Sequence, residues 1–327
     1  MINQPNKQIR VLSIDGGGVR GIIPARILQE IETRTGRRIH ELFDLIVGNS
    51  TGGILALGLV TPDEKRQAKF KAKELVNFYQ QNCAKIFSHS WWGKVSTGWG
   101  LWSPKYSRDN LDKILKEVLG DVKMSQTLKP AMITSYSLDQ SLPHLWTTRR
   151  AKQAPHHDYY IRDVAGATSA APTYFPPKVI KTPDGRTLHE VDGGLWANNP
   201  EFTTVEELKA MGVTATDTDV LIVSLGTGQA KLGRPAKELV NAGIIGWLIK
   251  ASSNLIDIMM NADSEWSQDA IEAIYPNNYR LQTPITASLS AMDNSSKQNM
   301  EGLLQAAEAY LKEQEQVIDE ICNALTA

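Results

Sequence analysis

The N-terminal part of the chain alternates between short apolar runs and stretches whose apolar positions recur at helical spacing. Residues 8–14 alternate between apolar and polar side chains and are rich in branched residues, which predicts a strand. Helical spacing follows over 22–34 and stops before Gly36, a residue type that commonly ends helices. A second apolar run, 42–47, precedes a second helix-like run, 54–59. This β-α-β-α opening predicts a parallel sheet with helices on its faces.

The rest of the chain continues to alternate between the two periods. Helical spacing is present in several further segments: 64–87, 109–119, 158–171, 200–211, 236–274 and 295–325. Strand patterns cover 131–138 with its expected hairpin partner 143–148, then 187–191, 219–225 and the expected edge strand 278–282. Residues 219–225 are almost continuously apolar, which indicates a buried, central strand.

Taken together, these elements predict an α/β protein with three layers, α/β/α, around a central and mostly parallel sheet. No internal repeat, low-complexity block or linker divides the chain. We therefore expect a single domain over 8–327. Its motif-bearing core spans 8–230, and its C-terminal part, 236–327, is helical.

Composition and charge exclude some classes of protein. Of the 327 residues, 42% are hydrophobic and 22% charged, which is ordinary globular composition. A formal net charge of -1 supplies no field to attract nucleic acid. Cys83 and Cys322 lack metal-ligand spacing and are expected as reduced thiols, with one disulfide left open; no metal or cofactor is expected.

The polarity of the N-terminus bears on localisation. Residues 1–8 are polar and lack the apolar core of a signal peptide. No uninterrupted apolar stretch is long enough to span a membrane. The expectation is a soluble, cytoplasmic protein that associates with membranes when active. Homo-oligomer formation is left open.

The candidate nucleophile is Ser50, in the Gly-x-Ser-x-Gly motif formed with Gly48 and Gly52. The motif lies between a predicted strand and a predicted helix, which is the context of a nucleophile elbow. Glycines permit the sharp turn that exposes the serine hydroxyl, and the N-terminus of the following helix favours developing negative charge. The alternative is a glycine-rich loop with a capping serine.

The first predicted strand runs into a second glycine-rich loop. Consecutive glycines at Gly16, Gly17 and Gly18 expose backbone N–H groups, so the loop is a candidate oxyanion hole. Arg20 would brace this loop or neutralise an anion. A competing interpretation is the dinucleotide fingerprint, which Gly16, Gly18 and Gly21 satisfy. The acidic residue expected at the end of the next strand is missing.

A serine hydroxyl needs a general base to take its proton. None of the six histidines lies after position 189, and His189 itself sits within a strand pattern. Asp192 ends that strand and precedes Gly193 and Gly194, at the kind of strand end where α/β folds place their sites. Asp192 is the preferred candidate, and a simple Asp-Gly turn is the alternative.

These segments together resemble the patatin-like phospholipase family. The resemblance is carried by the glycine loop 15–21, the elbow 48–53 and the blocks 167–177, 192–200 and 224–228, in the family's order. It implies a patatin-like α/β fold and a Ser50–Asp192 dyad without a catalytic histidine. The amides of Gly17 and Gly18 would be the oxyanion donors, and Gly48, Gly52, Gly193, Gly194 and Arg20 would support the site.

The resemblance also implies an activity, the calcium-independent hydrolysis of acyl esters of phospholipids or other lipids. Asn49 departs from the threonine common in the family, which predicts tuning of the site. Because the signal peptide of plant storage members is missing, the sequence favours an intracellular, bacterial-type member. Two apolar segments are candidates to line an acyl cleft or touch a membrane: the tryptophan-rich 91–102 and 243–249. Ordinary core packing is their alternative.

Three functions remain open at this point. The first is a lipid acyl hydrolase of phospholipase A or lysophospholipase type that works through an acyl-enzyme. The second is a general serine carboxylesterase with a histidine-assisted triad, for which His189 is the late histidine. The third is a non-catalytic nucleotide-binding or storage protein.

Overall fold

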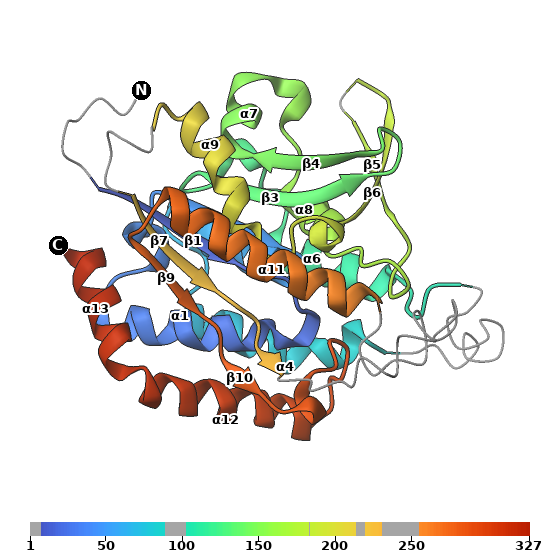
Figure 1. Cartoon of the computed structure of the whole chain (residues 1–327). Coiled ribbons are helices and arrows are strands. Elements are labelled where there is room, and N and C mark those ends of the chain that lie inside the picture. The colour runs from blue at the N-terminus through green and yellow to red at the C-terminus, as the bar shows by residue number, and fades with distance from the viewer. Residues whose placement is uncertain (1–7, 89–102, 183, 214–219, 231–254) are drawn as a thin grey trace.

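One mixed sheet of eight strands carries the fold in the computed structural model, which describes residues 8–88, 103–182, 184–213, 220–230 and 255–327 (Figure 1). The strand order is β5-β6-β3-β2-β1-β7-β9, with β4 paired to β3. These strands are β1 (Ile9–Ile14), β2 (Leu45–Asn49), β3 (Ala131–Ser137), β4 (Leu142–Thr147), β5 (Lys178–Lys181), β6 (Thr187–Asp192), β7 (Val220–Leu225) and β9 (Asn278–Leu281). A separate pair is formed by β8 (Gln229–Ala230) and β10 (Pro284–Ile285).

The parallel part of the sheet is continuous from β3 through β2, β1 and β7 to β9. Strand β7 is buried along its whole length between β1 and the edge strand β9, as its apolar run predicted. Antiparallel pairing is confined to one end, where β4 and β6 both pair with β3 and β5 pairs with β6. The predicted three-layer fold with a mostly parallel sheet is confirmed.

Helices cover both faces of this sheet (Figure 1). One face packs against α1 (Ile22–Thr35), α2 (Ile39–Leu42), α3 (Thr51–Val60), α4 (Ala72–Ile86), α6 (Asp109–Leu119), α7 (Thr148–Gln153), α8 (Ile161–Thr168), α12 (Lys297–Glu313) and α13 (Glu315–Thr326). The other face packs against α9 (Thr204–Ala210) and α11 (Leu255–Ile274).

Alternation along the strands explains why the core has two halves. Side chains of successive strand residues point to opposite faces of a sheet. In β1, Leu12 belongs to the core beneath α1, whereas Val11 belongs to the core beneath α11. A parallel strand buried on both faces therefore needs apolar residues at consecutive positions, as β1 and β7 have.

Several predicted elements differ from the observed ones in their limits. The helix expected over 64–87 begins only at Ala72, because the preceding residues form a turn closed by a bridge between Pro62 and Ala68. The helix expected over 158–171 is shortened to α8. The one expected over 200–211 starts as a 3-10 turn (Pro200–Thr203), and the Asn199 side chain accepts a hydrogen bond from the Glu201 amide there. Gly36 ends α1 in the left-handed conformation (φ 65°), as predicted.

Some expectations concern parts of the chain that the structure does not describe. Residues 91–102, with Trp91, Trp92, Trp99 and Trp102, and residues 243–249 lie outside the described residues. No helix among the described residues has the length and apolar character to cross a membrane. Cys83 and Cys322 are both buried and free, so the disulfide left open by the sequence is not formed.

A pair of matched substitutions tests the assignment of the core. Leu12 is 0% exposed in β1, whereas Leu142 in β4 is 57% exposed. Replacing Leu12 by Ala leaves a cavity, so we expect the free energy of unfolding to fall by about 2–5 kcal/mol. Leu142→Ala should change it by less than about 1 kcal/mol. Urea denaturation followed by circular dichroism measures both, and equal losses would contradict the assignment.

Candidate active site

The candidate nucleophile and base are brought together by the register of three strands. Strand β4 pairs with β3 from Met132 to Ser137, so β4 occupies one edge of β3. Strands β2 and β6 therefore share the other edge, running toward each other. There Asn49 of β2 pairs with Thr134 of β3, and Asp192 of β6 pairs with the next residue, Ser135. The C-terminal ends of β2 and β6 thus meet, and Ser50 follows the first of them.

Ser50 occupies a sharp turn between β2 and α3. Its backbone angles are φ 52° and ψ −122°, a conformation that costs energy for a residue with a side chain. Its amide donates a 2.7 Å hydrogen bond to Oγ1 of Thr168, which helps to hold the turn. A Cβ atom at Gly48 would collide with the carbonyl of Gly52, and one at Gly52 would collide with the carbonyl of Ile14. Close backbone approach therefore explains both motif glycines.

Asp192 is 5% exposed and is held by backbone amides. Its Oδ1 accepts a 2.8 Å hydrogen bond from the Gly194 amide, and its own amide donates to the Ala170 carbonyl. Burial raises the pKa of Asp192 to about 6. Interactions with the Ser50 hydroxyl and the Gly194 amide act in the opposite direction and lower this pKa. The carboxylate is thus a stronger base than an ordinary aspartate and still ionised at neutral pH.

Asn49 fills the space behind the two candidate catalytic residues. It is fully buried, and its Oδ1 accepts a 2.7 Å hydrogen bond from Oγ1 of Thr134. Its Nδ2 lies near enough to Asp192 to lower the pKa of that carboxyl, although no described residue completes a hydrogen bond to it. A Cβ atom at Gly193 would lie 2.6 Å from Oδ1 of Asn49, which explains the first glycine after Asp192.

The glycine loop passes directly over Ser50. A Cβ atom at Gly16 would lie 3.1 Å from Cβ of Ser50. The Gly16 amide donates a 3.0 Å hydrogen bond to the Asn198 carbonyl, which corrects the expectation that all three glycines offer free amides. The amides of Gly17 and Gly18 have no hydrogen-bond partner among the described residues, and both glycines line the cavity next to Ser50.

The loop is fixed from several sides. Arg20 braces it as expected, because its Nε donates to the Gly17 carbonyl and its Nη1 to the Gly228 carbonyl. Thr227 donates from Oγ1 to the Gly16 carbonyl at 2.6 Å. Gly18 has φ 59°, and a Cβ there would collide with the Met292 carbonyl. The block 224–228 and the segment near Met292 therefore determine the shape of the loop.

Sequence reasoning missed Arg280, which anchors the start of the glycine loop. Its guanidinium binds both carboxylate oxygens of Asp15, at 2.9 and 2.5 Å, and the pair is buried. It also donates to the hydroxyls of Ser224 and Ser264. Burial raises the pKa of Asp15 despite the opposing effect of Arg280. The signal in the sequence was an arginine within the short predicted strand 278–282.

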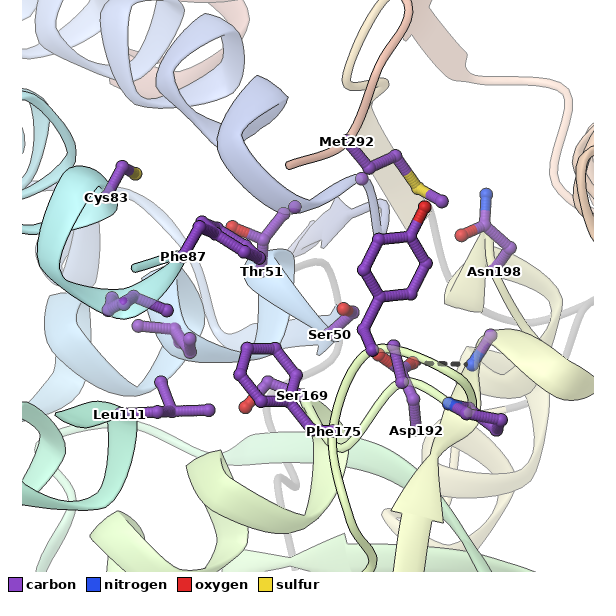
Figure 2. Close-up of a pocket in the computed structure, with 18 of the residues that line it drawn as sticks. Ser50, Thr51, Cys83, Phe87, Leu111, Ser169, Phe175, Asp192, Asn198 and Met292 are labelled. Atoms are coloured by element: carbon purple, nitrogen blue, oxygen red, sulfur yellow. Dashed lines mark hydrogen bonds between the residues drawn. The ribbon is translucent and has the colours of Figure 1, made fainter. Parts of the chain in front are cut away.

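An apolar cavity opens beside Ser50, with an empty volume of about 940 Å³ that includes its mouth. Figure 2 shows Ser50 between two groups of side chains: Phe87, Leu111 and Phe175 on one side, and Asp192, Asn198 and Met292 on the other. The apolar walls come mainly from α3, α4, α6 and the segment after α8: Ile54, Phe78, Tyr79, Cys83, Ile86, Leu111, Pro172, Tyr174 and Phe175.

None of the histidines that the structure describes lines this cavity. His189 points elsewhere: its side chain is 45% exposed and its Nδ1 is hydrogen-bonded to Asp139 at 3.0 Å. His189 and Asp192 are three positions apart along β6, which corresponds to roughly 10 Å. The geometry therefore gives the histidine-assisted triad no support.

Comparisons with known proteins show which family the chain resembles. The family model described as Patatin-like phospholipase matches residues 12–205, more than half of the chain. Patatin-like protein 2 of Oryza sativa subsp. indica is 32% identical over 93% of this chain and 84% of that protein. Patatin-like protein 2 of Arabidopsis thaliana is 30% identical over 93% of this chain and 83% of that protein.

Patatin-15 of Solanum tuberosum is 31% identical over 94% of this chain and 84% of that protein. These relatives are plant proteins, which corrects the expectation of a bacterial-type member. The crystal structure of VipD from Legionella pneumophila is matched over 93% of this chain and 67% of that chain, with 14% identity and a TM-score of 0.39, too weak a likeness to support an argument. By its sequence and by the match to the family model, the chain belongs to the patatin-like phospholipase family.

Proposed function

We propose that the protein is a lipid acyl hydrolase of phospholipase A or lysophospholipase type, with Ser50 as nucleophile and Asp192 as base. The observation that carries the proposal is the meeting of β2 and β6 on one edge of β3. As a result, the partly exposed Ser50, on a strained turn, lies beside a buried carboxylate at the wall of an apolar cavity. Such a cavity fits an acyl chain.

Acylation begins when Asp192 takes the proton of the Ser50 hydroxyl as Oγ attacks the ester carbonyl. The bond between Oγ and the carbonyl carbon forms, and the carbonyl oxygen becomes an oxyanion. The uncommitted amides of Gly17 and Gly18 are the proposed donors to this oxyanion, with the positive N-terminal end of α3 nearby. The carbon–oxygen bond to the alcohol then breaks, and the alcohol leaves with the proton from Asp192.

Deacylation repeats these steps with water as the nucleophile. Asp192 takes a proton from water as the water oxygen attacks the acyl carbon. The bond between that carbon and Oγ of Ser50 breaks, the proton returns to Oγ, and the fatty acid is released. Because a carboxylate is a modest base for a hydroxyl, much of the acceleration has to come from stabilisation of the oxyanion.

The proposed catalytic domain extends over the whole of 8–327. Arg280 holds Asp15 at the start of the glycine loop, and the Met292 carbonyl accepts a hydrogen bond from the Val19 amide at its end. Both residues lie beyond the motif-bearing core 8–230. These two contacts between the C-terminal part and the proposed oxyanion loop support the proposal of a single catalytic domain.

Peripheral contact with a lipid surface is part of the proposal. Leu195 and Met260 line the cavity beside Ser50. Leu195 is exposed, and so is Met259, which precedes Met260 in α11. An apolar rim of this kind favours contact with a membrane surface, from which a lipid can enter the cavity.

Substitution of the proposed base tests the dyad. Asp192→Asn keeps the shape of the side chain and removes its basicity, so kcat should fall by about 10²–10⁴-fold. Release of fatty acids from mixed phospholipids, followed by mass spectrometry, measures this loss. Ser50→Ala should abolish labelling by a fluorophosphonate.

The matched control for Asp192→Asn is His189→Ala. This substitution removes the histidine nearest to Asp192 in sequence and should leave kcat unchanged. Loss of activity in His189→Ala together with full activity in Asp192→Asn would favour a histidine-assisted esterase. Thermal stabilisation by nucleotides without any ester hydrolysis would favour the non-catalytic alternative.

The pH dependence follows from the environment of Asp192. Only the ionised carboxylate accepts a proton, and burial raises its pKa to about 6. We therefore expect kcat/KM to rise with pH, with its midpoint near this value and a plateau above neutrality. At pH 5 roughly a tenth of the plateau value should remain. A soluble p-nitrophenyl ester gives the profile, with circular dichroism showing that the protein stays folded. A profile that stays flat down to pH 4 would argue against Asp192 as the base.

A further inference from the structure

A second cavity lies on the other side of the glycine loop, and it is polar. Its empty volume is about 640 Å³, including the open mouth. Gly17 and Gly18 line the apolar cavity, whereas Asp15 and Arg20, at either end of the same loop, line the polar one. Asn198 and Met260 line both. The two cavities are therefore neighbours, separated by the proposed oxyanion loop.

The lining of the polar cavity consists mainly of neutral hydrogen-bonding groups, together with one cation, Arg20, and one carboxylate, Asp15. Amide and hydroxyl side chains come from four segments: Thr227, Gln229, Asn261, Ser264, Gln282 and Ser290. Arg20 contributes the guanidinium. The carboxylate of Asp15 is bound on both oxygens by Arg280, so its charge is balanced within the protein. Such a set suits a ligand with hydroxyl groups and a single anionic group.

The polar cavity lies next to the place where the ester bond of a substrate would be cleaved. An ester carbonyl at the amides of Gly17 and Gly18 has two substituents, the acyl chain and the alcohol. The acyl chain fits the apolar cavity. The alcohol portion then has to leave in another direction, and the neighbouring space beyond Asn198 and Met260 is polar.

We propose that the polar cavity is the subsite for the head group of the substrate, a glycerol-based alcohol that carries hydroxyls and a phosphodiester. This inference rests on the proposed hydrolase function. It adds that the enzyme recognises both ends of its lipid, with the phosphodiester near Arg20 and the hydroxyls near the amide side chains. A lipid ester without a polar alcohol portion leaves this subsite empty.

Asn261 is the residue of choice for a test. It lies on the exposed face of α11, lines the polar cavity and forms no hydrogen bond with any other described residue. Its replacement therefore disturbs few contacts in the protein. Asn261→Leu removes an amide and puts an apolar group in its place, so a polar head group loses a partner.

The measurement is a ratio of two values of kcat/KM, one for a lysophospholipid and one for the p-nitrophenyl ester of the same fatty acid. In Asn261→Leu this ratio should fall by about three- to tenfold, the effect of one lost hydrogen bond. The matched control is Gln268→Leu, on the same helix but away from both cavities, which should leave the ratio unchanged. An unchanged ratio in Asn261→Leu, or an equal fall in Gln268→Leu, would overturn the proposal.

Two further outcomes separate this inference from the proposed function. If the wild type hydrolyses neither substrate, the hydrolase function fails and the head-group subsite fails with it. A soluble glycerophosphodiester without acyl chains serves as the second probe. It should inhibit hydrolysis of the p-nitrophenyl ester competitively, and more weakly in Asn261→Leu. Stimulation of hydrolysis would instead indicate a regulatory site for a free phosphate compound, contrary to the proposal.

Discussion

The candidate site depends on one edge of strand β3 that two other strands share. Strand β2 arrives in parallel and stops at Asn49, and β6 arrives from the opposite direction and stops at Asp192. Two strand ends facing each other in one sheet are held by backbone hydrogen bonds on both sides, so the distance between their side chains varies little. Pre-organisation of this kind is what a serine and its base require, because misplacement by an ångström is costly in rate.

Much of this arrangement was predictable from local sequence. The strand–turn–helix context of Ser50, the strand–turn context of Asp192 and the run of glycines after β1 are all local signals, because they depend on backbone conformation at neighbouring residues. The same holds for α1 and α6, whose ends follow from helical spacing and from the glycine that ends each of them. The predicted limit of a helix was wrong where a turn of mixed composition precedes the helix, as before Ala72.

The remaining features depend on contacts between distant parts of the chain. Positions 16, 17 and 18 are all glycine, yet among the described residues only the amide of Gly16 finds a hydrogen-bond acceptor, the carbonyl of Asn198, which lies 182 positions later. That β2 and β6 share one edge of β3 depends on how far along β3 each strand pairs. The alternation of apolar and polar residues in a strand does not specify this register. Arg280 reaches Asp15 from an edge strand, and no local pattern indicates this partner.

The ion pair between Asp15 and Arg280 joins residues that are 265 positions apart. During synthesis, the glycine loop and Ser50 leave the ribosome long before Arg280 does. Until the last strand has been added to the sheet, Asp15 is without its partner and the loop over Ser50 lacks its anchor. An enzyme that degrades lipids is thereby assembled only once β9 has been synthesised, and fragments that end before β9 contain the serine without Arg280, the anchor of the loop over it.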